Sequence, residues 1–340
     1  MLRKLLLLLV FGAVALLASG LFQRNALSLS NVSNPATGPD VGGKIAFARD
    51  GALWLYTGGK AQQLTEGPRD RNDKRDAQPS FSPDGLEIVY ARFDEGFSDL
   101  YRLDLSNPSE PVALTDNRPS VETGALGYNQ QALWAMQPAW SPDGQRIAYI
   151  SDVGTEYPGL FSMDPQGNRA RRLESLNHGV QGVEQPSWSP DGTKLAVANY
   201  VTNNGQGQIW VLNLSTGRWV ELTNAKDGAY SPAWSPDGEW IAFTMRQGSV
   251  HNIYVVPTDA TRWQGEYPTP VQITTDGASR SPAWSPDGTQ LAYLSLKDGL
   301  FDLYVGEIAI DDDGRPRLAA VHRLTEKAGI DATSGLSWGP

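Results

Sequence analysis

The segment Pro232-Ala-Trp-Ser-Pro-Asp-Gly-Glu-Trp-Ile-Ala-Phe243 decides the fold, because closely similar segments recur along the chain. The tetrapeptide Ser-Pro-Asp-Gly occurs five times, each time after an aromatic residue and with a proline three positions before its serine. The copies are Ser82–Gly85, Ser141–Gly144, Ser189–Gly192, Ser235–Gly238 and Ser285–Gly288. Successive copies begin 59, 48, 46 and 50 residues apart. This spacing is typical of the four-stranded blades of a β-propeller.

Each copy predicts a tight hairpin turn. Proline fixes φ near −65° at the second turn position, aspartate can hydrogen-bond the local backbone, and glycine accepts a positive φ. A nearly continuous apolar run follows, such as Arg146–Ile150 or Trp240–Thr244, as expected for a strand that is covered on both faces. A third strand, such as Gln208–Leu214, and a fourth that usually ends in Leu-Thr or Ile-Thr complete the unit.

Two incomplete units flank the five complete ones. Residues 45–65 resemble the second to fourth strands of a blade, whereas Ser334–Pro340 resembles a first strand, with Trp338 in the place of the repeat aromatic. We therefore predict an all-β, six-bladed β-propeller that is closed by a C-terminal strand joining the first blade. Closure leaves no long bare sheet edge. The aromatic residues that precede the turns are expected to lie between neighbouring blades.

The N-terminal residues predict export. Arg3 and Lys4 precede the apolar run Leu5–Ala18, which is shorter than the roughly 20 residues of a membrane span. Residues 1–24 are thus interpreted as a signal peptide or an N-terminal membrane anchor, residues 25–43 as a flexible linker, and residues 44–340 as the propeller. The basic flank predicts a periplasmic or extracellular location for the rest of the chain, attached to the membrane if the N-terminal segment is not cleaved.

The composition excludes several classes of site. The chain has no cysteine, so a disulfide framework, a thiolate zinc site and a cysteine nucleophile are excluded. Its net charge of −10 disfavours nucleic acid as a partner. His178, His251 and His322 fall at different places in the repeat, so we predict no metal site and no cofactor.

The pattern Gln/Ser-Pro-x-Trp-Ser-Pro-Asp-Gly-x-x-Ile/Leu-Ala, with Asp/Asn-Ile/Leu-Tyr further on, resembles the TolB-like propeller family and its WD-like Pro-Asp repeats. The resemblance covers about residues 43–340 and implies a propeller domain alone, without the α/β domain that precedes the propeller in TolB. It also implies a non-catalytic envelope protein that binds a protein partner at one face. Similar propellers precede serine peptidase domains or act as sugar-acid lyases, so the fold does not define the function.

In such a ring, the residues just before each Gln-Pro or Ser-Pro lie at one mouth of the central channel. These positions vary where the rest of the repeat does not, which is typical of a binding surface. The candidate binding residues at the mouth and its loops are Arg75, Asp76, Glu122, Tyr128, Trp134, His178, Glu184, Gln185, Tyr230 and Arg280. The long segment Asp116–Met136 predicts a lid or recognition loop. A solvated rim without a ligand remains the alternative.

The predicted function is an exported, non-catalytic scaffold that binds a protein, for instance another envelope protein. The alternative is a carbohydrate- or small-ligand-processing hydrolase or lyase with His178 and Glu184 as its acid–base pair. Gly335–Gly339 matches the nucleophile pattern Gly-x-Ser-x-Gly, but a nucleophile elbow needs a following helix and a later histidine. The segment instead aligns with the repeat, so we predict no catalytic serine there.

Overall fold

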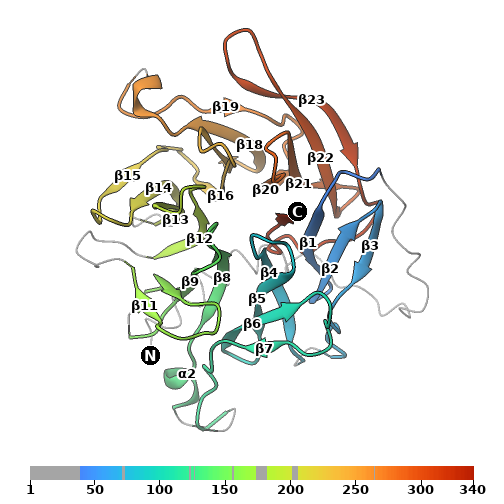
Figure 1. The fold of residues 1–340 in the computed structure, drawn as a ribbon, viewed down its shortest axis with the longest axis vertical. Coiled ribbons are helices and arrows are strands. Elements are labelled where there is room, and N and C mark those ends of the chain that lie inside the picture. The colour runs from blue at the N-terminus through green and yellow to red at the C-terminus, as the bar shows by residue number, and fades with distance from the viewer. Residues whose placement is uncertain are drawn as a thin grey trace.

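The computed structural model describes residues 39–70, 73–121, 124–125, 127–154, 157–173, 182–200, 206–263 and 265–340. These residues form six four-stranded antiparallel sheets arranged radially as blades (Figure 1). The predicted all-β, six-bladed propeller is confirmed. Within the same ranges, the helical elements are one turn of α-helix, α2 (Tyr128–Gln131), and the 3₁₀ turn η1 (Ala260–Arg262).

The strands of each blade are given from the channel outward. The first blade comprises β24 (Ser337–Gly339), β1 (Lys44–Arg49), β2 (Ala52–Thr57) and β3 (Lys60–Gln63). The second comprises β4 (Arg75–Phe81), β5 (Glu87–Phe93), β6 (Ser98–Asp104) and β7 (Val112–Ala113). The third comprises β8 (Ala135–Trp140), β9 (Ile147–Ser151), β10 (Gly159–Met163) and β11 (Arg171–Arg172). The fourth comprises β12 (Val183–Trp188), β13 (Lys194–Asn199), β14 (Gln208–Asn213) and β15 (Trp219–Glu221). The fifth comprises β16 (Ala229–Trp234), β17 (Trp240–Gln247), β18 (Val250–Pro257) and β19 (Val271–Gln272). The sixth comprises β20 (Ser279–Trp284), β21 (Gln290–Lys297), β22 (Leu300–Ile310) and β23 (Pro316–Arg323).

The Ser-Pro-Asp-Gly turns are held by their own side chains. In the fifth blade, the Ser235 hydroxyl donates to Asp237 Oδ1 at 2.5 Å and accepts the backbone N–H of Trp240 at 2.9 Å. Asp237 Oδ1 also accepts the N–H of Glu239 at 2.9 Å, and Gly238 has a φ of 76°. The other four turns repeat the Ser-to-Asp bond at 2.5–2.6 Å. The local sequence therefore specifies the hairpin before any blade packing occurs.

The repeat aromatic residues lie between blades, as predicted. Trp188 donates its indole N–H to Ala139 O of the preceding blade at 2.9 Å, and Trp284 does the same to Ala233 O at 3.1 Å. Trp140 and Trp234 donate instead to the glycine carbonyl of their own turns, each at 3.2 Å. Trp140, Trp188 and Trp284 are less than one-tenth exposed, and each belongs to a core cluster shared by two blades.

The ring is closed by the C-terminal strand. β24 pairs antiparallel with β1, with Ile45 opposite Trp338, and the C-terminus lies beside β1 near the centre of the ring (Figure 1). The Ser337 hydroxyl accepts the backbone N–H of Phe81 in the second blade at 3.0 Å. Ser337 is thus part of an innermost strand, in agreement with the rejection of a nucleophile elbow.

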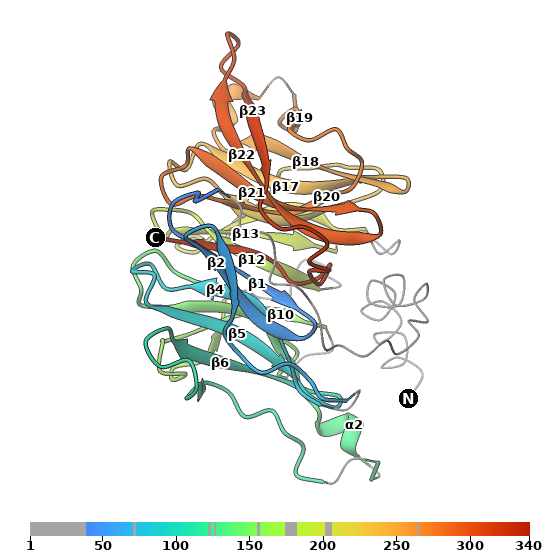
Figure 2. The same cartoon turned by 90° about the vertical axis from the view of Figure 1, so that its right-hand side faces the viewer.

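The connections divide between two faces of the ring. Ser-Pro-Asp-Gly turns lie on one face, together with the C-terminus. Connections from second to third strands, and from each fourth strand to the next blade, lie on the other face, on the right in Figure 2. We call this second face the mouth face. No helix among the described residues is long and apolar enough to cross a membrane. The predicted signal or anchor lies outside the described residues, as does the linker up to residue 38.

Candidate binding site at the channel mouth

One residue of the innermost strand in each of five blades has a positive φ, directly before the repeat proline. These residues are Gln78, Gln137, Gln185, Ser231 and Ser281, with φ between 51° and 59°. The ladder to the second strand shifts register at the same place in all five blades. A bulge of this kind bends the strand and redirects the neighbouring side chains. The bulges therefore position the side chains that surround the channel where it opens onto the mouth face.

Three of these residues connect successive blades through their side chains. Gln78 Oε1 accepts the backbone N–H of Gln137 at 2.9 Å, and Gln137 Oε1 accepts that of Gln185 at 2.8 Å. Gln185 Oε1 in turn accepts the N–H of Ser231 at 2.7 Å. The side-chain carbonyl of Gln185, a predicted binding residue, therefore holds the fourth blade to the fifth. The sequence signal for this ladder is the Gln-Pro pair, which occurs in three repeats.

The residues before these five positions form a ring around the channel together with Ser334, which precedes Gly335 (φ 66°) at the start of the C-terminal strand. This mouth ring consists of Ala77, Met136, Glu184, Tyr230, Arg280 and Ser334. Ser334 is buried, whereas the other five side chains are partly exposed. Glu184, Tyr230 and Arg280 come from consecutive blades. The polar part of the ring is therefore continuous over the fourth, fifth and sixth blades.

Glu184 belongs to a small cluster with two tyrosines. The Tyr200 hydroxyl donates to Glu184 Oε2 at 3.0 Å, and the rings of Tyr200 and Tyr230 lie 6.3 Å apart. Burial raises the pKa of the Glu184 carboxyl above its usual value, although the Tyr200 hydrogen bond acts in the opposite direction. Burial, followed by the nearby Glu184 charge, raises the pKa of Tyr200. Sequence reasoning missed Tyr200, whose only signal is its place just after a second strand.

Arg280 has a different environment. Its guanidinium carbon lies 4.6 Å from the centre of the Phe301 ring, and its Nε is enclosed without a hydrogen-bond acceptor. Burial lowers the pKa of Arg280. His251 is the second residue of the neighbouring β18 strand. Its pKa falls to about 4, first because of burial and then because of the charges of Arg280 and Arg246. His251 is therefore neutral at pH 7.

The buried carboxylate of Asp76 has its charge balanced by Arg92. It is 2% exposed and binds Arg92 through both oxygens, with Nε–Oδ1 and Nη2–Oδ2 distances of 2.7 and 2.9 Å. Arg92 also lies over the Tyr101 ring at 4.5 Å. Arg75, the residue before Asp76, is exposed. This placement favours a structural role for Asp76 and leaves Arg75 accessible on the mouth face.

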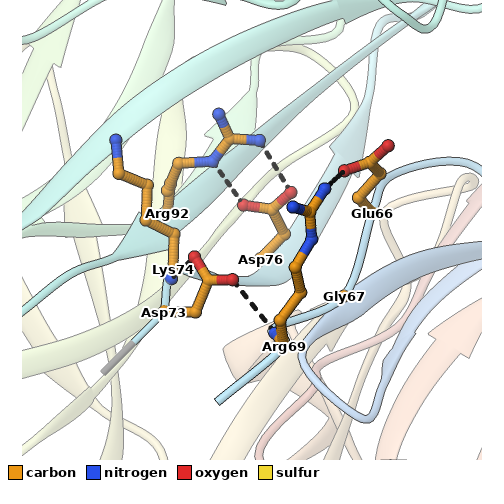
Figure 3. Close-up of a pocket in the computed structure, with 7 residues that line it drawn as sticks. All are labelled: Glu66, Gly67, Arg69, Asp73, Lys74, Asp76 and Arg92. Atoms are coloured by element: carbon orange, nitrogen blue, oxygen red, sulfur yellow. Dashed lines mark hydrogen bonds and ion pairs between the residues drawn. The ribbon is translucent and has the colours of Figure 1, made fainter. Parts of the chain in front are cut away.

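A charged pocket of about 230 Å³ lies beside this ion pair (Figure 3). Its lining consists of Glu66, Gly67, Arg69, Asp73, Lys74, Asp76 and Arg92. Arg69 binds Glu66 at 3.2 Å, and its backbone N–H donates to Asp73 Oδ2 at 3.0 Å. Most acidic and basic side chains of the lining thus pair with one another, as expected for a solvated loop.

The described residues of the segment Asp116–Met136 contact the second blade through Tyr128 and Trp134. Tyr128 is 8% exposed and donates its hydroxyl to the backbone carbonyl of Glu95. The Trp134 ring lies 6.2 Å from that of Phe93, and α2 lies at the outer rim in both views (Figures 1 and 2). These placements favour an anchoring role for Tyr128. The lid and the binding roles of Tyr128 and Trp134 stay predictions.

Two predicted site residues, Glu122 and His178, lie outside the described residues. His251 and His322 lie in different blades, in β18 and β23 respectively. Within the described ranges, no three His, Asp or Glu side chains converge as metal ligands would.

Comparison with known proteins supports the architecture. Residues 125–277 match the family model of the TolB beta propeller domain. The crystal structure of TolB from Acinetobacter baumannii superimposes with a TM-score of 0.64 at 20% identity, over 89% of this chain and 68% of that one. A chain of the nidogen/laminin complex superimposes with a TM-score of 0.60 at 11% identity, over 87% of this chain and 98% of that one.

A curated relative adds a partial match. The uncharacterized peptidase YuxL of Bacillus subtilis (strain 168) is 28% identical over 105 residues, which cover 30% of this chain. The match spans only 14% of the length of that relative. Taken with the six closed blades and the repeated turns, the comparisons show that residues 125–277 carry the TolB beta propeller domain pattern and that the protein has a six-bladed β-propeller fold similar to that of TolB.

Proposed function

We propose that this protein is an exported, non-catalytic propeller that binds a protein partner through the mouth ring and the adjoining loops of the mouth face. One observation carries the proposal. The residues that recur in five of the blades serve the turns and the blade contacts, whereas the partly exposed mouth-ring positions hold alanine, methionine, glutamate, tyrosine and arginine. Side-chain variety at the exposed end of a rigid repeated scaffold is what a recognition surface requires.

The proposed setting is the cell envelope. The basic, apolar N-terminal residues support export, with residues 1–24 as a signal peptide or anchor and residues 25–43 as a linker. An acidic net charge of −10 supports a protein rather than a nucleic acid as partner. A structurally similar chain belongs to the nidogen/laminin complex, and such an assembly of two proteins agrees with a protein-binding role. We propose another envelope protein as the partner.

Site-specific photo-cross-linking in the native envelope tests the face. A photoreactive amino acid is placed at Met136, which is partly exposed in the mouth ring, or at Leu86, which is 61% exposed on the opposite face. We expect a discrete cross-linked protein from position 136 and none from position 86. Adducts of equal yield from both positions, or none from position 136, would contradict the proposal.

The alternative function is a carbohydrate- or small-ligand-processing enzyme that uses the same mouth. It is favoured by the partly buried Glu184, whose raised pKa is typical of a general acid. His178 would be its partner in acid–base chemistry. Assays on a panel of oligosaccharides with the wild type and Glu184→Gln separate the two functions. Turnover that depends on Glu184 would establish the enzyme, and absence of such turnover agrees with the binding role.

A further inference from the structure

We infer that Arg280 is the anchor for a carboxylate carried by the partner, so that the mouth face recognises an acidic peptide segment. The inference rests on the proposed binding function and specifies the chemistry of its ligand. It follows from three features: Arg280 has no counter-ion among the residues that the structure describes, its neighbouring groups favour an anion, and its guanidinium suits a carboxylate.

Arg280 lacks the ion pair that several other buried or partly buried arginines have. Among described residues, five other buried or partly buried arginines each have a nitrogen within 4.0 Å of a carboxylate oxygen: Arg49, Arg92, Arg102, Arg146 and Arg323. Arg49 and Arg323, like Arg280, have an Nε atom without a hydrogen-bond partner. Each of these two arginines nevertheless forms an ion pair with a carboxylate. In the described part of the chain, the side chain of Arg280 has neither an ion pair nor a hydrogen bond, and its guanidinium lies over the Phe301 ring.

A shortage of acidic residues does not explain why Arg280 lacks an ion pair. The chain has 38 acidic and 28 basic residues. Asp276 comes from the loop just before β20, but its oxygens accept bonds from Ser279 at 2.8 Å and from Ser295 at 2.6 Å. Ser279 and Arg280 are adjacent in β20 and point to opposite sides of the strand. The Asp276 carboxylate is thus held on the side of β20 opposite to the Arg280 side chain.

The neighbours of Arg280 favour an anion. Arg246, the penultimate residue of β17, pairs with His251 and is exposed. The charges of Arg280 and Arg246 both act on His251, with no carboxylate acting on it. This part of the mouth therefore presents two cations and a neutral imidazole that can donate or accept a hydrogen bond. The nearby Asp227 accepts the backbone N–H of Gly248 at 2.7 Å.

The guanidinium is suited to a carboxylate. Its central carbon lies over the Phe301 ring, and a guanidinium that stacks on an aromatic ring keeps its N–H donors at its edge. Only Nε is fully enclosed without a partner, so the terminal nitrogens remain for a ligand. A planar fork of N–H donors matches the two oxygens of a carboxylate and forms charge-assisted bonds that are stronger than neutral ones.

Binding of dye-labelled hexaglutamate, followed by fluorescence anisotropy at low salt, tests the inference. We expect Arg280→Gln to weaken binding at least tenfold and Arg280→Lys to weaken it less, because lysine keeps the charge but lacks the fork. The matched control is Arg218→Gln, which removes an exposed arginine from the β14–β15 turn on the opposite face and is expected to leave binding unchanged. Hexaglutamine should not bind. The melting temperature of Arg280→Gln should not fall, which excludes unfolding as the cause.

Several results would overturn the carboxylate assignment. One is equal binding of hexaglutamate by wild type and Arg280→Gln, and another is no binding by the wild type. A third is displacement of the peptide by inorganic phosphate but not by acetate at equal ionic strength, which would identify a phosphate site. In each case, the cross-linking at position 136 still decides the proposed function independently.

Discussion

The indole N–H of Trp338 donates to the carbonyl of Gly42 at 3.0 Å, across 296 residues of chain. This bond joins the end of the propeller to its beginning, beside the ladder between β24 and β1. Closure matters for the candidate site because all innermost strands share one channel. An open ring would not hold Glu184, Tyr230 and Arg280 at fixed distances.

Deletion of Ser334–Pro340 is expected to abolish cooperative folding or cause aggregation. The deletion bares the inner edge of β1 and removes the buried Trp338, whose loss alone costs about 3–5 kcal/mol. Thermal unfolding followed by circular dichroism measures the effect. Leu86→Ala, at a side chain that is 61% exposed, is the control with an unchanged transition. An unchanged melting temperature of the truncated form would rule out the closure account.

The repeat glycines are expected to matter through their backbone conformation. Gly288 has a φ of 73°, and a Cβ there would meet Pro236 only at 3.6 Å, an ordinary contact. Gly288→Ala should therefore cost about 1 kcal/mol of unfolding free energy from backbone strain. Gly265→Ala, at a position without a positive φ and with open space around it, should be neutral. Urea denaturation compares the two, and equal effects would refute the turn assignment.

Arg92 and Arg280 are expected to respond oppositely to loss of charge. Arg92→Met leaves the 2% exposed Asp76 without its cation, which should cost about 3–5 kcal/mol. Arg280→Met leaves no buried acid behind and should not destabilise the protein. Chemical denaturation of both variants tests this contrast. A comparable loss in Arg280→Met would mean that Arg280 has an internal partner after all.

His251 is expected to make stability depend on pH. Its folded pKa of about 4 lies below the usual value of 6.5, so the unfolded chain binds the extra proton first as the pH falls. The contribution is therefore complete above pH 6.5 and is lost as the pH falls toward 4, by roughly 1–3 kcal/mol in total. His251→Gln should flatten the stability profile in this window. A wild-type profile that persists unchanged in the variant would contradict the assignment.

Most of the fold could be predicted from the sequence, because each Ser-Pro-Asp-Gly turn is a local device. The hydroxyl of Ser235 and the carboxylate of Asp237 form their hydrogen bonds within a few residues. All the residues that determine the turn therefore lie in one short segment of sequence. Closure was also predictable, since Trp338 repeats the position of Trp284 in the pattern. The domain boundaries at residues 24 and 43 stay predictions.

The candidate site was less predictable, because partners there come from different parts of the chain. The residue type of Asp76 suggested an exposed binding group, but Arg92 neutralises it. Gln185 proved to be a link between blades. Neither fact is visible without the register of the strands. Arg280 was a candidate from position alone, and only the structure shows that it lacks a counter-ion.

The most direct test of the binding role compares the envelope proteins that bind to the wild type and to variants of the mouth face. The wild type, the double variant Glu184→Ala/Arg280→Ala and the control Arg218→Ala are immobilised at equal density and exposed to extracts of the native envelope. Retained proteins are quantified by mass spectrometry after the melting temperatures are shown to be equal. We predict a protein that the wild type and Arg218→Ala both retain and that the double variant loses. Retention of the same proteins in the same amounts by all three would contradict the account.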